Sequence, residues 1–547
     1  MPAFTRLKRL SEIGTILAKY GLTAFMPRPI ISVLRLDKSA ADEKSYRDLS
    51  VEERIKKAFE ELGTTFIKLG QILSLRGDVI PHNMIKEFKK LQDDVKPLPY
   101  EKIKPILEDQ LMGPIDEVFS TFNVEPIATA SISQVYSAVL REGGQKVVVK
   151  VRKPGLVETI KGDMEIILWI ADIFHKTGTF SNKIDFKGIA EEFFLTMNEE
   201  LDLIVEKKNT QKFAANFNGS EWFWLKFPEM YDQFCTNEVL VMEYIDGFKL
   251  SQINDPDSQI EIDRKEVASR GAKLLMKMIL EDGFFHADLH SGNLFFHENN
   301  NVSIIDCGMS SKLDRYLREK ISDMFIAFAA KDYNRIANIY LEMSETGSSV
   351  NKKAFIHDIR KIGESLPDNL SEVKTTEMLY KVSNVLFKYK LRVPRELTQL
   401  IRSMIMVEGL CRELDPDFEL LTVATQLSKE LMVQRYTPER IAQEVFSLIV
   451  QLAETGKKLP LHISDIMDKI EDGSIQHRLL FLLGRSERTF ISKLVTRISS
   501  AGMIAGSLIA SGSLKEEPYC WIIWSVFSIS SLIFLLTFSK GKTNEIK

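Results

Sequence analysis

The chain has 547 residues, of which 44% are hydrophobic and 27% are charged, and its formal net charge is −4. These proportions are typical of globular proteins, and the length exceeds that of one ordinary hydrophobic core, so two or three domains are expected. A mildly acidic chain is a poor match for nucleic-acid binding, so no nucleic acid is expected among its partners.

The first segment, residues 1–45, combines cations with an apolar stripe at helical spacing. The cations are Arg6, Lys8, Arg9 and Lys19, and the stripe is Leu7, Leu10, Ile13, Ile16 and Leu17. Such a helix either lies on an anionic membrane surface or packs its stripe against the next domain. No long uncharged run with a cleavage site follows, so a secretory signal peptide is not expected.

Residues 46–118 predict a mostly helical extension, and shorter strands follow it. Ser50 and Glu53 have the spacing of a capping box at the start of a helix, and residues 65–75 form a second helical stretch. From residue 119 the pattern changes, with strands expected at 134–140, 146–151 and 239–245. Helices are expected between residues 156 and 216, over 264–283, and from 312 to about 490, with one of them opened by Pro394.

Residues 284–308 carry the most specific pattern in the chain. Asp288 is followed five residues later by Asn293 and eighteen residues later by Asp306, which begins an Asp-x-Gly triplet. Protein kinases place an Asp, an Asn and a second Asp in this way, the first near the accepting group and the others on Mg²⁺. Carboxylate and amide oxygens suit that ion. We therefore predict Asp288 as catalytic, and Asn293 and Asp306 as magnesium ligands.

A kinase-type site also needs a strand lysine that holds the nucleotide phosphates and a helix glutamate that aims it. Lys150 ends an apolar strand similar to the Val-Ala-Ile-Lys strand of kinases, and we predict it as that lysine. Glu206 is the chosen partner. A lone strand lysine is ordinarily a surface charge, and helix carboxylates are ordinarily solvated, so spacing by itself leaves this pairing open.

The loop that would cover the phosphates lacks the usual glycines. Where a Gly-x-Gly-x-x-Gly pattern is expected, the chain has Ala128, Thr129, Ala130 and Ser131. Their Cβ atoms restrict close approach of the backbone, which predicts altered nucleotide preference or slower transfer while the pocket is kept. The strand at 239–245 suits the connector between two lobes, and Glu243 and Ile245 are expected to contact the nucleotide.

Taken in order, these motifs resemble the UbiB family of atypical protein-kinase-like proteins. The resemblance covers roughly residues 45–420. It is carried by Lys-x-Gly-Gln (Lys68, Gly70, Gln71), the Ala-rich loop, Glu-x-Asp (Glu200, Asp202), the Asp288–Asn293 loop, Asp306-x-Gly308, and Glu408-Gly409 with the residues after it. The chain departs from the family pattern at Leu289 and Ser291, where prolines are common, at Thr129 among the alanines, and at Cys307, which replaces Phe.

The resemblance implies a kinase-like core with an N-terminal extension folded over the active site. Lys68 and Gln71 would approach Glu200 and Asp202, which would block peptide access. It further implies binding of ATP or ADP with Mg²⁺, ATPase or atypical kinase activity, and support of ubiquinone-type quinone biosynthesis at the membrane. The expected partners are ATP, membrane lipids, prenylated quinone precursors and quinone-biosynthesis enzymes.

The predicted fold class is α+β, a bilobal protein-kinase-like fold with helical additions at both ends. The predicted segments are a basic N-terminal segment (1–45), the helical extension (46–118), the N-lobe (119–245), the C-lobe (246–430), a helical linker (431–493) and a transmembrane hairpin (494–540). Neither the sequence nor the resemblance fixes which quinone is served, the phosphoryl acceptor, or the oligomeric state.

The hairpin is predicted from two uncharged stretches near the C-terminus. Residues 519–538 are long enough for a helix to cross the hydrocarbon core, and residues 498–514 are shorter and contain Gly502-x-x-x-Gly506. Basic residues flank both sides, which places both flanks and the catalytic domain on the cytoplasmic face of the inner membrane. A buried helical hairpin, in a soluble protein or a dimer interface, is the alternative. The four scattered cysteines indicate reduced thiols on that side.

Two other functions compete with a quinone-linked ATPase. The residues around Asp288 also resemble those of aminoglycoside and choline kinases, which predicts a small-molecule phosphotransferase. A small-molecule phosphotransferase would not explain the Lys-x-Gly-Gln motif or the predicted hairpin. The second rival is a nucleotide-sensing scaffold that binds without turnover.

Overall fold

The computed structural model describes residues 3–23, 49–74, 80–91, 97–177, 186–255, 257–344, 350–367 and 375–435. The predicted linker beyond residue 435 and the predicted hairpin at 494–540 lie outside these ranges. Within them, no helix combines the length and apolar character needed to span a bilayer.

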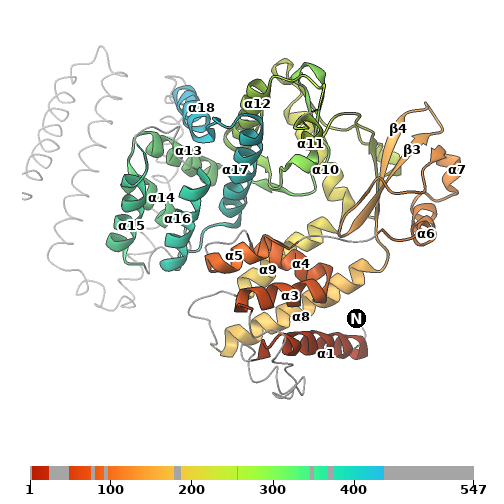
Figure 1. The fold of residues 1–547 in the computed structure, drawn as a ribbon, viewed down its shortest axis with the longest axis horizontal. Helices are drawn as coiled ribbons and strands as arrows, with labels where there is room; N and C mark the ends of the chain where they lie inside the picture. Colours follow the sequence, from red (N-terminus) through yellow and green to blue (C-terminus); the bar gives the residue numbers. More distant parts are fainter. Residues whose placement is uncertain are drawn as a thin grey trace, which may run out of the picture. The chain divides into compact units, whose positions relative to one another are not determined.

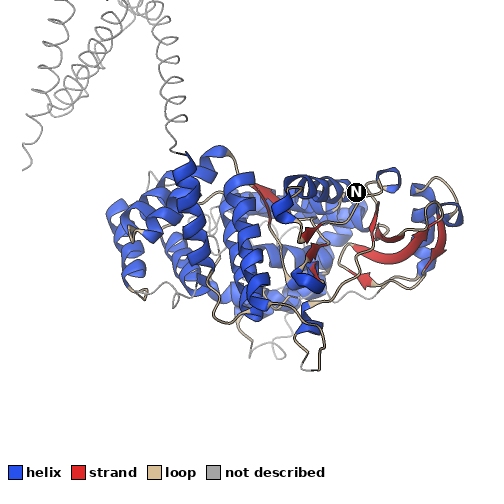
Figure 2. Ribbon diagram, turned by 90° about the horizontal axis from the view of Figure 1, so that it is seen from above, coloured by secondary structure: helices blue, strands red, loops and turns tan. Residues whose placement is uncertain are grey.

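The described residues form long helices and short strands (Figures 1 and 2). The helices are α1 (Ala3–Lys19), α3 (Val51–Leu62), α4 (Thr64–Leu73), α5 (His82–Phe88), α6 (Tyr100–Gln110), α7 (Ile115–Val118), α8 (Leu156–Thr177), α9 (Phe186–Glu200), α10 (Leu203–Asn216), α11 (Leu250–Ile253), α12 (Arg264–Lys277), α13 (Arg315–Ala329), α14 (Tyr333–Met343), α15 (Lys352–Glu364), α16 (Thr375–Lys388), α17 (Arg395–Leu414) and α18 (Leu420–Arg435). The strands are β1 (Phe119–Phe122), β2 (Ala128–Thr129), β3 (Ser133–Leu140), β4 (Lys146–Arg152), β5 (Leu225–Lys226), β6 (Val239–Glu243), β7 (Phe284–His286), β8 (Leu294–Phe296), β9 (Val302–Ile304) and β10 (Ser310–Lys312).

Helix α1 packs its apolar stripe inside the protein, which decides between the two sequence-based alternatives. Leu10, Ile13 and Ile16 are buried in one cluster with residues of α3, α4, α8 and α9. Arg9 donates to the carboxylate of Asp163 on α8 at 2.7 and 2.9 Å. A stripe covered by protein is not available to a bilayer, so the membrane-surface interpretation of this helix is wrong.

The extension and the two long helices between β4 and β6 share this cluster. Buried residues of α8 and α9 pack with α3 and α4, and Figure 1 shows these helices side by side. Helix α3 begins with the predicted capping box: Glu53 N–H donates to Ser50 Oγ at 3.2 Å, and Ser50 N–H donates to Glu53 Oε2 at 2.8 Å. The layer that carries the Lys-x-Gly-Gln motif thus rests on helices that lie between β4 and β6 in the sequence.

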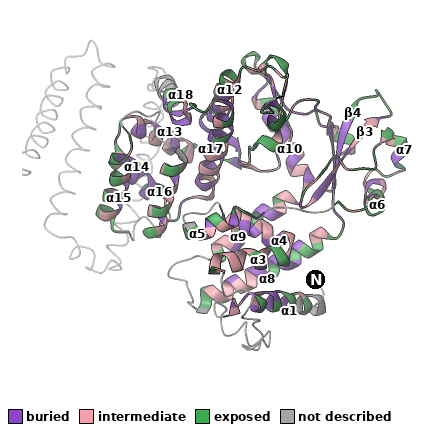
Figure 3. Cartoon of the chain, in the orientation of Figure 1, coloured by how far each residue is buried: buried purple, intermediate pink, exposed green. Residues whose placement is uncertain are grey.

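An antiparallel sheet forms the N-lobe, in the order β1-β3-β4-β6 with β2 also paired to β3. Because side chains alternate along a strand, Val147, Val149 and Val151 of β4 share a buried cluster with α6. Val148 lies in a different cluster, with Leu203 of α10. Because both faces of β4 are covered, residues 147–151 are all buried and the strand is largely purple in Figure 3. Lys150 belongs to the second, α10-facing register.

The C-lobe is mainly helical, with two small sheets at the site. Strand β7 pairs with β10, and β8 pairs with β9, which is also joined by β5 in parallel. The loop from β7 to β8 carries Asp288 and Asn293, and the loop from β9 to β10 carries Asp306. A single buried cluster includes residues of β7, β8, β9, α12, α13 and α17. Helix α17 starts directly after Pro394, as predicted.

Candidate active site

Lys150 is buried and held by two carboxylates. Its Nζ donates to both Glu206 oxygens, at 2.8 and 2.7 Å, and to Asp306 Oδ2 at 3.3 Å. Glu206 lies in the first turn of α10 with 5% of its surface exposed. The alternating register of β4 directs Lys150 toward α10, which is why a strand lysine and a helix glutamate 56 residues apart meet.

The electrostatics of this trio keep the lysine charged. Burial opposes the charge on Lys150, but Asp306 and Glu206 outweigh it and raise its pKa. Burial would also raise the pKa of Asp306, yet Lys150 and the Gly308 N–H lower it to about 2. Burial raises the pKa of Glu206 to about 7 in spite of Lys150. Of the two carboxylates, Asp306 is therefore the one that stays ionised beside the Lys150 ammonium at neutral pH.

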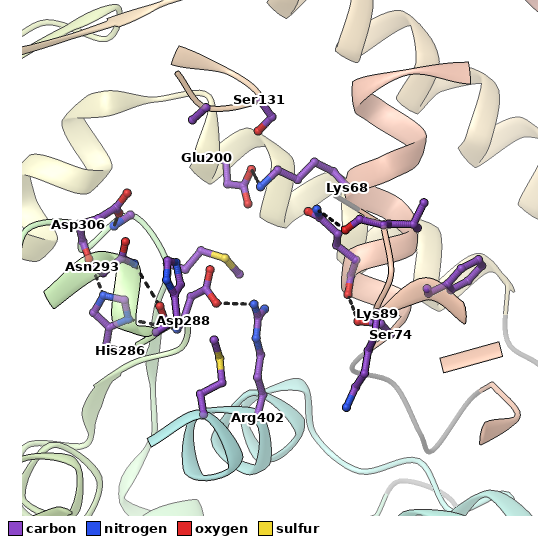
Figure 4. A pocket seen from close by; sticks show the side chains of 18 of the residues that line it. Lys68, Ser74, Lys89, Ser131, Glu200, His286, Asp288, Asn293, Asp306 and Arg402 are labelled. Carbon is purple, nitrogen blue, oxygen red and sulfur yellow. Dashed lines mark hydrogen bonds and ion pairs between the residues drawn. The ribbon is translucent and has the colours of Figure 1, made fainter. Parts of the chain in front are cut away.

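Asp288 and Asn293 are fixed by hydrogen bonds within their own loop (Figure 4). Asn293 Nδ2 donates to the Asp288 carbonyl at 3.2 Å, so its amide oxygen remains available to a cation. The Asp288 N–H donates to His286 Nδ1 at 3.1 Å, and His286 Nε2 lies 2.5 Å from the Asp306 carbonyl. Since Nδ1 accepts, Nε2 carries the proton and donates. Burial lowers the pKa of His286, which favours this neutral form.

Two residues of α17 contact the loop that carries Asp288, and the sequence did not predict either of them. Arg402 forms an ion pair with Asp288 Oδ1, and the neighbouring Ser403 hydroxyl donates to the His286 carbonyl at 2.7 Å. Arg402 lies 114 residues after Asp288 and outside the Glu408-Gly409 motif of the same helix. The available signal was weak: two polar residues beside the buried stripe of Leu397, Leu400 and Met404.

The Ala-rich loop lies against the cavity as predicted from its position before β3. Residues 128–133 line the cavity, and Ala130 N–H donates to the Ser133 carbonyl at 2.9 Å, which makes a tight turn. Lys153, buried at 6% exposure, donates to the Ala130 carbonyl at 2.6 Å. Charged and backbone groups therefore hold this loop in place where kinases use glycines.

The extension reaches the cavity through Lys68 on α4. Its Nζ lies 3.4 Å from Glu200 Oε2, at the end of α9, and both side chains are mostly buried. Gln71 contacts the Leu91 carbonyl, with Nε2 at 3.4 Å. A Cβ at Gly70 would lie 2.2 Å from Leu91 Cδ1, which explains the glycine between them in the motif.

Three expected site residues lie elsewhere. Asp202 accepts from Ile204 N–H at 3.0 Å as the N-cap of α10, and it does not line the cavity with Lys68 and Gln71. A short polar side chain directly before a helix satisfies an otherwise open N–H there. Glu243 pairs with Lys226, and its N–H donates to the Glu229 carbonyl at 2.8 Å. Neither Glu243 nor Ile245 is among the described residues that line the cavity.

The remaining predicted residues, apart from Gly70, line one cavity of about 830 Å³. Its lining includes Lys68, Gln71, Ala128–Ser131 of the Ala-rich loop, Lys150, Glu200, Glu206, Asp288, Asn293, Asp306 and Arg402. The volume suits a nucleotide. No group of three or more His, Cys, Asp or Glu side chains arranged for a metal occurs in the described ranges. One carboxylate and one amide still fit Mg²⁺, which commonly takes few protein ligands and completes its shell with phosphate oxygens and water.

Comparison with known proteins identifies the family. Residues 90–340 match the ABC1 atypical kinase-like domain, and residues 359–419 match the UbiB helical domain. A protein of Aeromonas salmonicida named "Probable protein kinase UbiB" is 31% identical over 461 residues, which cover 83% of this chain and 84% of that protein. The chain belongs to the UbiB family. The resemblance drawn from the motifs is therefore confirmed.

Further proteins are similar to this chain over much of its length. A "Probable protein kinase UbiB" of Pseudomonas entomophila is 30% identical over 483 residues, covering 87% of this chain and 88% of the relative. An "Uncharacterized protein in hydrogenase 1 5'region" of Clostridium pasteurianum is 29% identical, with 91% of each chain covered. A solved complex of a Mycobacterium tuberculosis protein with erythromycin covers 66% of this chain and 92% of that one, at 22% identity and a TM-score of 0.45.

The two matched family domains together contain most of the residues that form the site. The ABC1 atypical kinase-like domain spans the strand of Lys150 and both loops with Asp288 and Asp306. The UbiB helical domain spans α16 and α17, and so includes Arg402. The kinase-like α+β fold with added helical regions is thus confirmed for the described residues, and the cavity draws on both matched domains.

Proposed function

We propose that this UbiB protein binds ATP or ADP with Mg²⁺ in the 830 Å³ cavity and hydrolyses ATP in support of membrane quinone biosynthesis. One observation carries the proposal: the buried Lys150 ammonium lies 3.3 Å from Asp306 and is aimed by Glu206. An ammonium beside a carboxylate in a cleft is the arrangement by which kinases hold phosphates and metal together.

Each residue has a distinct role in this proposal. Lys150 binds phosphate oxygens, and Glu206 keeps its ammonium pointed at them. Asn293 and Asp306 hold Mg²⁺, which neutralises charge on the phosphates when it is bound. Asp288 orients the attacking water. Most of the rate enhancement then comes from positioning and electrostatics, as is usual in phosphoryl transfer.

The extension supports water or a small lipid, and not a peptide, as the acceptor. Lys68 and Gln71 line the cavity, and the contact between Lys68 and Glu200 links α4 to α9 across it. This layer occupies space that a peptide substrate would need. A test is Lys68→Glu, Glu200→Lys and the double charge swap. Peptide phosphorylation that rises in the single variants and falls again in the swap would support exclusion by this contact, and no change would contradict it.

We further propose that the protein works at the cytoplasmic face of the inner membrane, anchored by the hairpin predicted at 494–540. Prenylated quinone precursors are insoluble in water, so a protein that helps extract or remodel them belongs at the bilayer. Membrane lipids and quinone-biosynthesis enzymes are the corresponding partners. Fractionation of cells that express the full chain and a chain ending at residue 493 tests this, since the anchor predicts release of the shorter chain from membranes.

The site is tested by ATPase and calorimetric nucleotide-binding assays on Asp306→Asn and Lys150→Ala. Asp306→Asn is expected to abolish magnesium-dependent turnover, and Lys150→Ala to weaken nucleotide binding. The exposed ion pair of Lys388 and Asp358 supplies matched controls, Lys388→Ala and Asp358→Asn. Unchanged turnover and binding in both site variants would reject the assignment. Binding without phosphate release in the unmodified protein, even beside vesicles, would favour a nucleotide-sensing scaffold.

The cellular role is tested by replacing the chromosomal copy with the Asp306→Asn variant. Quinones and their prenylated intermediates are then quantified in lipid extracts. The proposal expects less mature quinone and accumulated precursor in that strain. Normal levels of both, with the variant present at wild-type abundance, would contradict the link to quinone synthesis.

A further inference from the structure

Helix α17 touches the Asp288 loop with two neighbouring side chains. Arg402 pairs with the Asp288 carboxylate, and Ser403, fully buried, donates to the His286 carbonyl at 2.7 Å. Figure 4 shows the Arg402 side chain rising from its helix toward Asp288 at the wall of the cavity. Both contacts come from the helical domain and reach the kinase-like domain at the residue that faces the reaction.

In the described part of the chain, the loop itself donates no hydrogen bond to the Asp288 carboxylate, and several of its polar groups are engaged elsewhere. His286 is used between the Asp288 N–H and the Asp306 carbonyl. Asn293 Nδ2 donates to the Asp288 backbone carbonyl, and His290 Nδ1 accepts from Gly292 N–H at 3.0 Å. Within the described part of the chain, Arg402 is the hydrogen-bond donor to the Asp288 carboxylate oxygens.

Helix α17, which carries Arg402, is also anchored at its first residue. Arg395, at the start of α17, donates to Thr196 Oγ1 on α9 at 2.9 Å and lies 3.5 Å from the Glu199 carboxylate. Helix α9 ends at Glu200, the partner of Lys68. Because α17 is held by the contacts of Arg395 and of Ser403, the backbone that carries Arg402 is fixed. The guanidinium can therefore orient Asp288.

We propose that Arg402 is a positioning residue for phosphoryl transfer, and that it acts by holding Asp288 Oδ1 so that Oδ2 is presented to the attacking water. This inference rests on the proposed ATPase function. In the step concerned, the water oxygen forms a bond to the γ-phosphorus while the bond from that phosphorus to the β–γ bridging oxygen breaks. ADP leaves with the electron pair, and the proton of water ends on the phosphate product or in solvent.

A double-mutant cycle on the full chain tests this role through steady-state ATP hydrolysis. Arg402→Gln should lower kcat roughly 10- to 100-fold, because a misplaced reacting group costs on this scale, with the KM for ATP nearly unchanged. Arg402→Lys should restore part of kcat. In an Asp288→Asn background, Arg402→Gln should cause little further loss, since the group through which it acts has been altered.

The outcomes separate this role from others. If the losses in kcat multiply in the double variant, Arg402 acts on the phosphate independently of Asp288. If Arg402→Gln raises KM and lowers the melting temperature, its role is structural. Either result overturns the inference. Arg315→Gln, an exposed arginine on α13 paired with Glu319, is the control and should leave kcat and KM unchanged. An inactive wild-type protein overturns the proposed function as well, whereas an active wild type with an equally active Arg402→Gln variant overturns this inference alone.

Discussion

Replacing Lys150 with methionine tests the buried ion pair directly, because methionine keeps the unbranched stem and removes the charge. Glu206 would then remain buried without its counter-ion. Burial already raises the pKa of Glu206 to about 7, and Lys150 is the group that lowers it. We therefore expect Glu206 to be protonated in the folded variant at neutral pH.

The magnitude follows from the difference between the folded and unfolded chains. In the unfolded chain this carboxyl titrates near 4.5. Keeping it protonated at pH 7 costs about 1.4 kcal/mol for each of ~2.5 pH units, which is ~3 kcal/mol. A folded pKa above the unfolded value destabilises the protein above the unfolded pKa, and the loss shrinks as the pH falls. At pH 5 the same cost is about 0.7 kcal/mol.

Urea unfolding of the nucleotide-free protein, followed by far-UV circular dichroism, measures this at pH 7 and pH 5. The first cooperative transition of Lys150→Met is compared at each pH with that of the double variant Lys150→Met with Glu206→Gln, because wild-type Glu206, with its own pKa of about 7, already bears most of this cost. The double variant should be more stable than Lys150→Met by ~3 kcal/mol at pH 7 and by about 0.7 kcal/mol at pH 5. A gain of equal size at both pH values, or no gain, would refute the role given to Glu206.

Three further changes test the packing around the site by thermal melting. Gly70→Ala should destabilise the protein by about 1–3 kcal/mol, because the new Cβ meets Leu91 at 2.2 Å, whereas Gly409→Ala, with open space around it, should not; equal melting temperatures would contradict this. Ser50→Ala removes the cap of α3 and should cost about 1 kcal/mol, and Thr15→Ala, at an exposed position of α1, is its comparison. Arg9→Met leaves the buried Asp163 carboxylate without its guanidinium and should cost about 3 kcal/mol at pH 7; a melting temperature equal to that of wild type would argue against an uncompensated charge.

Much of the site could be predicted from the sequence because its chemistry is local. The spacing of Asp288, Asn293 and Asp306 reflects two short loops, each bounded by a strand on both sides. Helix starts at Ser50 and Pro394 were likewise predictable, since capping depends on neighbours three or four residues away. The lysine could be proposed from its strand, but its partner was a choice among several acidic residues on helices.

Where the structure places expected site residues away from the cavity lining, the contacts are set by packing. Asp202 matches a family motif, yet its position directly before α10 makes it an N-cap. Glu243 lies on the predicted connector strand, and Lys226 of β5 pairs with its carboxylate. The apolar stripe of α1 fitted a membrane surface or a protein surface equally well, because a periodic pattern records that a face is covered and not what covers it.

The sequence by itself determined that the chain holds a kinase-like set of a lysine, an amide and two carboxylates. These residues could be recognised because each lies on, or next to, a short strand whose pattern is visible in the sequence. Only the tertiary structure decided that Glu206 meets Lys150, that α8 and α9 support the extension, and that Arg402 reaches Asp288 from 114 residues away. The physical reason is that contacts across the core depend on how helices and sheets pack together, and the spacing of residues along the chain carries no record of that geometry.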